Sequence, residues 1–370
     1  MRGHCFVNGV EKHIYCAYVG IDGKAQYIMK PTGIIKYGGS IENLSVPRQN
    51  LSATAIDNYI LFGGGIWSTT AYSTVDAYDS SLIRTTATDL SVARSQLAAI
   101  TINNHALFAG GFVSNSTYTS TVDAYDNSLT RTTVSSLSQG RRWLVATTVG
   151  NYALFGGGNA RSSPTVSSTV DAYNSSLTRT TVTRLSVARY DLEAGTIGNY
   201  ALFAGGSAFI NKKNIYYSTV DAYNSSLTKT TATDLSVTRR TFASTTIGGH
   251  VLFGSGWIGN TMTPTVDAYD TSLTRSSAPD AEEFNGPVAF TLHNYALFCY
   301  LSGLNHPNPV MYDSFLTRSR IPAVLSARMC DFGYSVFKNY ALFGGGYLAG
   351  GKKNSTVEAY TYNDDDGYIL

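Results

Sequence analysis

The chain has 370 residues, a formal net charge of +2, 43% hydrophobic residues and 14% charged residues. This composition predicts a folded protein with a sizeable core and excludes an intrinsically disordered one. The small net charge gives no field to attract nucleic acid or an anionic membrane, and no apolar run is long enough to span a membrane. The first residues lack the apolar segment of a signal peptide, and the four cysteines form no Cys-x-x-Cys pair. We therefore expect synthesis in a reducing cytosol, with neither membrane insertion nor a nucleic-acid partner.

Residues 1–32 stand apart from the rest of the sequence. They contain Asn8-Gly9 and Asp22-Gly23, each flanked by alternating apolar residues, and both dipeptides are strong signals for two-residue hairpins. The segment 17–25 resembles short β modules of tail and baseplate proteins from phages and prophages of Gram-positive bacteria. That resemblance implies an N-terminal β arm that attaches the protein to a virion or tail-like particle. The alternative is a plain β-hairpin extension.

A repeat occupies residues 33–361. Its clearest segment, Asn-Tyr-Ala-Leu-Phe-Gly-Gly-Gly at 151–158, recurs in seven copies, whose phenylalanines are Phe62, Phe108, Phe155, Phe203, Phe253, Phe298 and Phe343. Each unit predicts four short strands: one rich in small residues, one apolar and closed by glycines, one reading Val-Asp-Ala-Tyr, and one rich in threonine. Seven such units without helical periodicity predict an all-β fold, a seven-bladed β-propeller. The glycines would permit positive φ and the close approach of neighbouring blades.

Three elements of each unit resemble the Kelch repeat: the glycine pair after the apolar strand, the Val-Asp-Ala-Tyr-Asp strand at 75–79, and the Leu-Ser-Val-Ala-Arg segment at 90–94. The resemblance implies a Kelch-like propeller, with two departures. The Kelch tryptophan is missing from the fourth strand, and the sixth unit lacks both the glycine pair and the leading arginine, so this blade is either degenerate or specialised. The seventh unit supplies only three strands. We expect the strand at 34–37 to complete it, which leaves 362–370 as a C-terminal tail.

No catalytic or metal-binding set emerges from the sequence. A copper site, as in galactose oxidase with its Kelch fold, needs paired imidazoles, but the histidines do not cluster. No sialidase-type Ser-x-Asp-x-Gly-x-Thr-Trp box occurs. The third-strand acids occupy equivalent positions in successive blades, so we expect them to be spread around the ring and unable to act as an acid/base pair. These observations predict a non-enzymatic protein without metal or cofactor.

Two sets of basic residues recur. One set leads into the innermost strands, where guanidinium groups are expected to bond carbonyl groups of neighbouring blades; the alternative is an anion site at the channel mouth. This set is Arg48, Arg94, Arg141, Arg189, Arg239 and Arg328. The other set falls on the outer strands and is interpreted as a solvated rim. It comprises Arg84, Arg131, Arg179, Lys229, Arg275 and Arg318.

The loops between second and third strands vary in length and content, while the strands around them barely change. They are rich in aromatic residues, which suit sugar rings or protein surfaces. We take as candidate ligand-binding residues Trp67, Tyr72, Phe112, Tyr118, Phe209, Tyr216, Tyr217, Trp257, His306 and Tyr347. The sequence thus predicts a non-catalytic recognition protein that presents these loops to a glycan or protein on a host cell surface. The alternatives are loops that vary without selection, an intracellular Kelch-type scaffold, and a carbohydrate-active enzyme with its site at the channel mouth. The enzyme would need two or more converging acids, which the loops do not supply.

Overall fold

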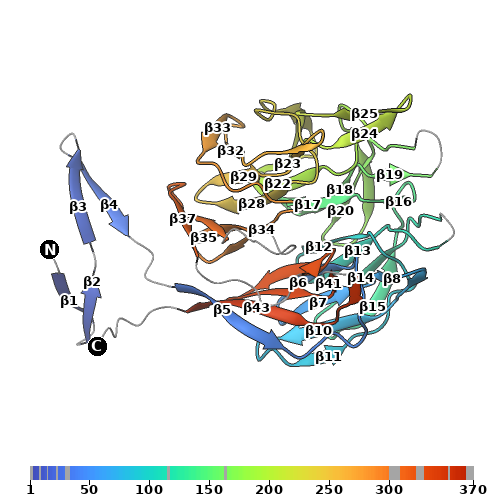
Figure 1. Ribbon diagram of the computed structural model, residues 1–370, viewed down its shortest axis with the longest axis horizontal. Coiled ribbons are helices and arrows are strands. Elements are labelled where there is room, and N and C mark those ends of the chain that lie inside the picture. Colours follow the sequence, from blue (N-terminus) through green and yellow to red (C-terminus); the bar gives the residue numbers. More distant parts are fainter. Residues whose placement is uncertain are drawn as a thin grey trace.

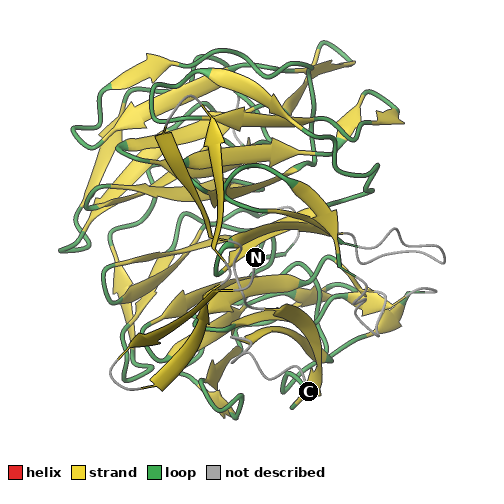
Figure 2. Ribbon diagram, turned by 90° about the vertical axis from the view of Figure 1, so that its left-hand side faces the viewer, coloured by secondary structure: helices red, strands yellow, loops and turns green. Residues whose placement is uncertain are grey.

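The computed structural model describes residues 3–7, 10–14, 16–21, 24–29, 34–114, 117–161, 165–299, 309–321, 329–348 and 351–363, with side chains from residue 35 onward. Within these ranges the chain forms strands and loops without helices, as Figure 2 shows. The described residues accordingly contain no helix able to cross a membrane. The predicted all-β class with repeated sheets is confirmed.

Most strands belong to seven four-stranded antiparallel sheets (Figure 1). The first three sheets are β6 (Ser52–Ile56), β7 (Tyr59–Gly63), β10 (Val75–Asp79) and β11 (Arg84–Thr86); β12 (Ala98–Ile102), β13 (His105–Ala109), β14 (Val122–Tyr125) and β15 (Arg131–Val134); and β17 (Val145–Val149), β18 (Tyr152–Gly156), β20 (Val170–Asn174) and β21 (Arg179–Val182). The next two are β22 (Glu193–Ile197), β23 (Tyr200–Ala204), β26 (Val220–Asn224) and β27 (Lys229–Thr231); and β28 (Ala243–Ile247), β29 (His250–Gly254), β32 (Val266–Tyr269) and β33 (Arg275–Ala278). The last two are β34 (Val288–Leu292), β35 (Tyr295–Cys299), β36 (Val310–Tyr312) and β37 (Arg318–Arg320); and β39 (Gly333–Phe337), β40 (Tyr340–Gly344), β43 (Val357–Asn363) and β5 (Ile34–Ile41).

The first strand of each sheet, here called the inner strand, contacts the inner strand of the next sheet. The contacts run from β6 through β12, β17, β22, β28 and β34 to β39, and β39 also contacts β6. Threonine hydroxyls join neighbouring inner strands, as between Thr54 and Thr101 and between Thr147 and Thr196, each pair 2.9 Å apart. Small polar side chains therefore suit the crowded positions where these strands meet.

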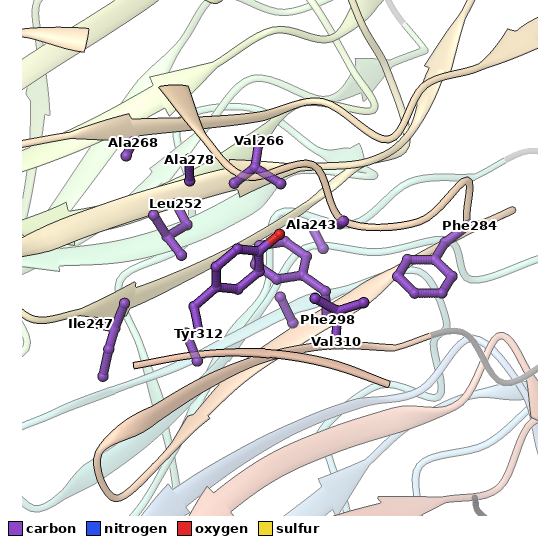
Figure 3. Packing of buried hydrophobic residues seen from close by; sticks show 13 residues of the cluster. Ala243, Ile247, Leu252, Val266, Ala268, Ala278, Phe284, Phe298, Val310 and Tyr312 are labelled. Atoms are coloured by element: carbon purple, nitrogen blue, oxygen red, sulfur yellow. The ribbon is translucent and has the colours of Figure 1, made fainter. Parts of the chain in front are cut away.

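The hydrophobic core lies between the sheets. Leu252 and Val266 of the fifth sheet pack with Phe298 and Tyr312 of the sixth (Figure 3). Another cluster combines residues of the first and seventh sheets, among them Ile60. Second strands contribute to the clusters on both of their sides, which explains why they are apolar almost throughout.

The glycine pairs hold neighbouring sheets together, as predicted. Gly157 has a φ of +65°, and a Cβ placed there would lie 2.7 Å from the carbonyl oxygen of Arg189 in the next sheet. That same oxygen accepts a hydrogen bond from the N–H of Gly158 at 2.9 Å. The equivalent bond from Gly346 to the carbonyl of Arg48, at 2.7 Å, joins the seventh sheet to the first. A side chain at the first glycine would block this contact.

The arginines that lead into the inner strands bond mainly within their own sheet. Arg141 is fully buried, its Nη2 lies 2.7 Å from Asp171 Oδ2, and its guanidinium donates to the carbonyl oxygens of Phe155 and Gly157. The prediction that these guanidinium groups bond neighbouring blades is wrong, because the neighbour is reached by the arginine's main-chain carbonyl instead. The same buried ion pair recurs as Arg48–Asp76, Arg94–Asp123, Arg189–Asp221 and Arg239–Asp267. Arg328 lies outside the described residues.

The outer basic residues are also more than a solvated rim. Arg179 Nη1 lies 3.0 Å from Asp171 Oδ1, so that one buried carboxylate bridges two guanidinium groups. The equivalent outer pairs are Arg84–Asp76, Arg131–Asp123, Lys229–Asp221 and Arg275–Asp267. Each acid is therefore held within its own sheet, as its repetition in successive units led us to expect.

The sixth sheet replaces this ion pair with an apolar pair. Phe284 stands where the first five repeats have arginine, and Val310 stands where they have the acid; both are fully buried (Figure 3). Changing both partners together avoids leaving a buried charge unpaired. The sheet forms despite the irregular sequence of this unit.

The structure has two differently built faces. Short β-strands follow the second strands and pair with the segments that lead into the inner strands, as in the bridges Gln49–Ile66, Tyr190–Ser207 and Arg240–Trp257. We call this side the loop face. Its small hairpins and pairs comprise β8 (Ile66–Trp67) with β9 (Thr70–Ala71), β16 (Arg141–Arg142) with β19 (Asn159–Ala160), β24 (Ser207–Ile210) with β25 (Lys213–Tyr216), β30 (Trp257–Ile258) with β31 (Thr261–Met262), and β38 (Met329–Cys330) with β41 (Tyr347–Leu348) and β42 (Lys352–Lys353).

The N-terminal strands join the sheets from the opposite face. They form two antiparallel pairs, β1 (Gly3–Val7) with β2 (Val10–Ile14) and β3 (Cys16–Ile21) with β4 (Lys24–Met29), and the predicted Asn-Gly and Asp-Gly dipeptides between the paired strands lie outside the described residues. Strand β5 then pairs with β43, and its first residue, Ile34, lies opposite Asn363, close to the turn at Asn339. In Figure 1, β1–β4 and the β24–β25 hairpin lie on opposite sides of the molecule.

Candidate functional site

The same position in each repeat, just before the inner strand, has a left-handed backbone. It is occupied by Asn50, Gln96, Trp143, Asp191, Thr241, Gly286 and Asp331, with φ values between 49° and 76°. The first five each lie two residues after an arginine, whereas Gly286 follows Phe284 and Asp331 follows Met329 at that spacing. Main-chain hydrogen bonds join four of the neighbouring pairs, including 2.6 Å from Asn50 N–H to the Asp331 carbonyl. We call these seven residues the mouth ring.

Side chains vary in the mouth ring and at the residue before it, although an arginine and a leucine recur on either side of this pair in most units. A left-handed conformation is unfavourable for a β-branched residue such as Thr241, and glycine would adopt it without cost. Strained backbone of this kind concentrates at functional sites. Five of the seven residues also line a cavity, which marks the mouth ring as a candidate site.

A cavity of about 300 Å³ opens beside the mouth ring. We call it the mouth cavity. Its walls include three acids and several apolar residues; those that matter below are Trp143, Asp191, Glu193, Thr241, Asp331 and Phe332. The acids come from segments far apart in sequence, since Asp191 precedes β22, Glu193 begins it, and Asp331 precedes β39.

The surroundings of all three acids raise their pKa values. Burial raises the pKa of Glu193 to about 8, opposed by a hydrogen bond from Ser244 Oγ at 3.2 Å. Burial also raises the pKa of Asp191, against the opposing charge of Arg240. Asp331 touches solvent at the rim, and desolvation by the surrounding protein still raises its pKa, against a hydrogen bond from Asn50. Carboxyl groups of this kind gain from a ligand that donates hydrogen bonds or carries positive charge.

The described lining of the cavity contains no lysine or arginine. Within the described part of the chain, no three histidine, cysteine, aspartate or glutamate residues are placed to hold a metal ion. The chemistry that the cavity offers is therefore that of carboxyl groups beside aromatic surfaces.

An arginine–aromatic stack adjoins the cavity on the loop face. The guanidinium carbon of Arg142 lies 3.8 Å from the centre of the Trp143 ring, 4.9 Å from that of Tyr118 and 5.6 Å from that of Phe112. Its Nη1 donates to Gln96 Oε1 at 2.9 Å, and Tyr190 packs against Trp143 with ring centres 5.9 Å apart. The stack connects the cavity wall to two of the predicted ligand residues.

The other predicted loop residues lie around this centre without lining the described cavity. Lys353 lies over the Trp67 ring at 5.7 Å, Arg240 lies over Tyr216 at the same distance, and Trp257 Nε1 donates to Asn285. Phe209, at the β24–β25 hairpin, is the most open, with 54% of its surface exposed. Tyr72, Tyr217 and Tyr347 are half-buried in their loops, and His306 lies outside the described residues.

The three cavity acids were not among the residues predicted from the sequence. The predictions covered the loops and the repeated third-strand acids, whereas Asp191 and Asp331 belong to the mouth ring and Glu193 to an inner strand. Two signals were available in the sequence: a pair of adjacent variable positions between the recurring arginine and leucine, and a glutamate among inner strands built from small residues.

These features define a class: an all-β protein of repeated four-stranded sheets, propeller-like, with a cavity where its inner strands begin. Among solved structures, that of YjhT, a Kelch-type protein, is similar with a TM-score of 0.56 and 11% sequence identity, covering 87% of this chain and 99% of the YjhT chain. At this identity the likeness concerns the fold alone. No family model and no curated protein matches the chain.

Proposed function

We propose that the seven sheets are the blades of one closed, Kelch-like β-propeller, with β5 completing the last blade. Three observations support closure: the contact between β39 and β6, the hydrogen bond from Asn50 to Asp331, and the shared core of the first and seventh sheets. A closed ring also leaves no open sheet edge between its ends.

The propeller is, in this proposal, a non-catalytic recognition protein that binds a glycan or protein on a host cell surface through its loop face. The observation that carries the proposal is the polarity of the molecule. The mouth cavity, the arginine–aromatic stack and the small hairpins share one face, and the N-terminal strands join from the other. Binding at one end and attachment at the other suit a protein mounted on a larger body.

The N-terminal arm supplies the attachment. Its strands form two separate two-stranded sheets, and isolated two-stranded sheets are marginally stable in water. Docking onto a partner would stabilise them. Together with the resemblance of residues 17–25 to phage tail modules, this favours a protein that is made in a bacterial cytoplasm and assembled into a virion or tail-like particle.

Binding of the fluorescently labelled full chain to bacterial cells and to a glycan array tests the proposal. We expect the triple variant Trp67→Ala, Phe209→Ala, Trp257→Ala to bind at least tenfold more weakly. A control variant changes Ile83 and Phe315, which are exposed at turns between third and fourth strands, to serine and should bind as the parent does. Absence of binding by the parent, or equal loss in the control, would refute recognition by the loop face.

The second candidate function is that of a carbohydrate-active enzyme, because acids do converge at the mouth cavity. A carboxyl group whose pKa is raised by burial, as that of Glu193 is, can act as a general acid beside an ionised Asp191 or Asp331. Hydrolysis of aryl glycosides by the parent, lost in Glu193→Gln, would favour the enzyme. Equal rates in both would leave recognition as the better account.

A further inference from the structure

The mouth cavity has room for one sugar unit rather than a length of chain. Its volume of about 300 Å³ lies at the lower end of the range for small-molecule sites, about 300–1,000 Å³. Its walls combine flat aromatic surfaces, Trp143 and Phe332, with carboxyl groups and the hydroxyl of Thr241. Aromatic faces cover the apolar side of a sugar ring, and carboxyl oxygens accept hydrogen bonds from its hydroxyl or amino groups.

The negative charge of the cavity determines which sugar units it can bind. Asp191 and Asp331 present carboxylates, and the described lining supplies no positive group to balance them; Arg240 acts on Asp191 from outside that lining. An anionic sugar would place a further carboxylate beside these groups and be repelled. An ammonium group would be attracted both by the carboxylates and by the aromatic faces.

The arginine–aromatic stack continues the cavity wall along the loop face. Trp143 belongs to both, and Arg142 links it to Tyr118 and Phe112. A chain whose end unit occupies the cavity would therefore run out over this stack, so that the chain end is bound first and the following units lie on aromatic surface.

We propose that the mouth cavity binds the non-anionic end unit of a glycan chain, and that it binds an amine-bearing end more tightly than a neutral one. This inference rests on the proposed glycan recognition by the loop face, and it names the ligand class of that face. It assigns Asp191 and Trp143 as ligand contacts, with the stack as the adjoining platform.

The test compares glycans grouped by their end unit: hexosamine, neutral hexose and uronic acid, on an array and by calorimetry with the β-1,4-linked glucosamine tetramer at pH 6.5. The parent should bind hexosamine ends at least tenfold more tightly than neutral ends and should not bind uronic-acid ends. Asp191→Asn should remove the preference for the amine, and Trp143→Ala should weaken all binding. Asp89→Asn changes an exposed acid that is bonded to Ser73 outside the cavity and serves as the matched control.

The inference is overturned if uronic-acid ends bind as well as the others, if no hexosamine-ended glycan binds, or if Asp191→Asn leaves the pattern unchanged. Cell binding separates this failure from failure of the proposed function. If the parent binds cells and both cavity variants bind them equally well, the cavity assignment falls and loop-face recognition stands. If the parent binds neither cells nor any glycan, both fall.

Discussion

Removing the acid of one buried ion pair should destabilise the protein far more than its position on a single strand suggests. Asp171 is fully buried, and its carboxylate meets Arg141 at 2.7 Å, Arg179 at 3.0 Å and the N–H of Ser138 at 3.2 Å. In Asp171→Val the guanidinium of Arg141 stays buried without its counter-charge. Breaking a buried pair from one side costs about 3–5 kcal/mol, a large fraction of the roughly 5–15 kcal/mol that stabilises a typical domain.

The sixth sheet supplies the matched double variant. Arg141→Phe with Asp171→Val reproduces the Phe284–Val310 arrangement, which removes both charges together. The double variant still leaves the carbonyl oxygens of Phe155 and Gly157 without their donor, at a cost of about 1 kcal/mol each. We therefore expect it to be less stable than the parent but about 1–3 kcal/mol more stable than Asp171→Val, since it carries no unpaired buried charge.

Urea unfolding followed by circular dichroism measures both free energies. Asp89→Asn, an exposed change, serves as the control and should shift stability by less than about 0.5 kcal/mol. A cost below about 1 kcal/mol for Asp171→Val would refute the reasoning that the pair is buried and coupled. So would a double variant whose loss equals or exceeds the sum of the two single losses.

Three further outcomes follow from the fold and the cavity. Gly157→Ala should lower the free energy of unfolding in urea by at least about 2 kcal/mol, because residue 157 has a φ of +65° and its Cβ would meet the Arg189 carbonyl oxygen. Gly249→Ala, at a φ of +78° but with open space around the Cβ, should lower it by only about 1 kcal/mol. Equal losses would contradict the close approach of the sheets. The pKa of Glu193, raised to about 8 from an ordinary 4.5, means that the folded state holds a proton which the unfolded state releases, so stability should fall as pH rises from about 5 to 8. Glu193→Gln should flatten this fall, by an amount on the order of a few kcal/mol, and an unchanged pH slope would show that the carboxyl is not desolvated. Deleting residues 1–32 should change the free energy of unfolding of the sheets by less than about 0.5 kcal/mol, because β1–β4 pair only within their own hairpins; a larger loss would mean that the arm is part of the propeller core.

The repeated strands could be predicted because each follows from local patterns. Residues 151–158 combine an apolar run with glycines, and residues 169–173 combine β-branched and aromatic residues, and both segments form strands close to the expected bounds. The glycine contacts were also predictable, since the pair recurs wherever an apolar strand ends. Local sequence decides these features, and repetition removes most of the ambiguity.

The partners of the arginines could not be predicted so easily. Arg141 and Asp171 are separated by 30 residues, and they meet because β18 and β20 pair in a register that places Phe155 opposite Asp171. Sequence patterns predicted the strands but did not indicate which carboxylate pairs with which guanidinium group. The two sets were therefore considered separately, the acids as spread around the ring and the arginines as carbonyl donors.

The mouth cavity could not be predicted from the sequence, for a related reason. Asp191, Glu193 and Asp331 approach one another because the segments leading into β22 and β39 end at the same cavity, and nothing local indicates that. The aromatic loop residues were more conspicuous, although most of them support the face from beside the cavity. The variable residues just before the inner strands were therefore a better guide to the cavity than the aromatic loop residues.

Which face binds can be measured directly by attaching a large polyethylene glycol chain to one face at a time. Asn260, exposed in the β30–β31 turn, places it on the loop face, and Asn104, exposed in the β12–β13 turn, places it on the opposite face. Each would be changed to cysteine in a chain whose Cys5, Cys16 and Cys330 are serine. We predict that polymer at residue 260 abolishes cell binding and that polymer at residue 104 leaves it intact. Binding that survives at residue 260 and is lost at residue 104 would contradict recognition by the loop face.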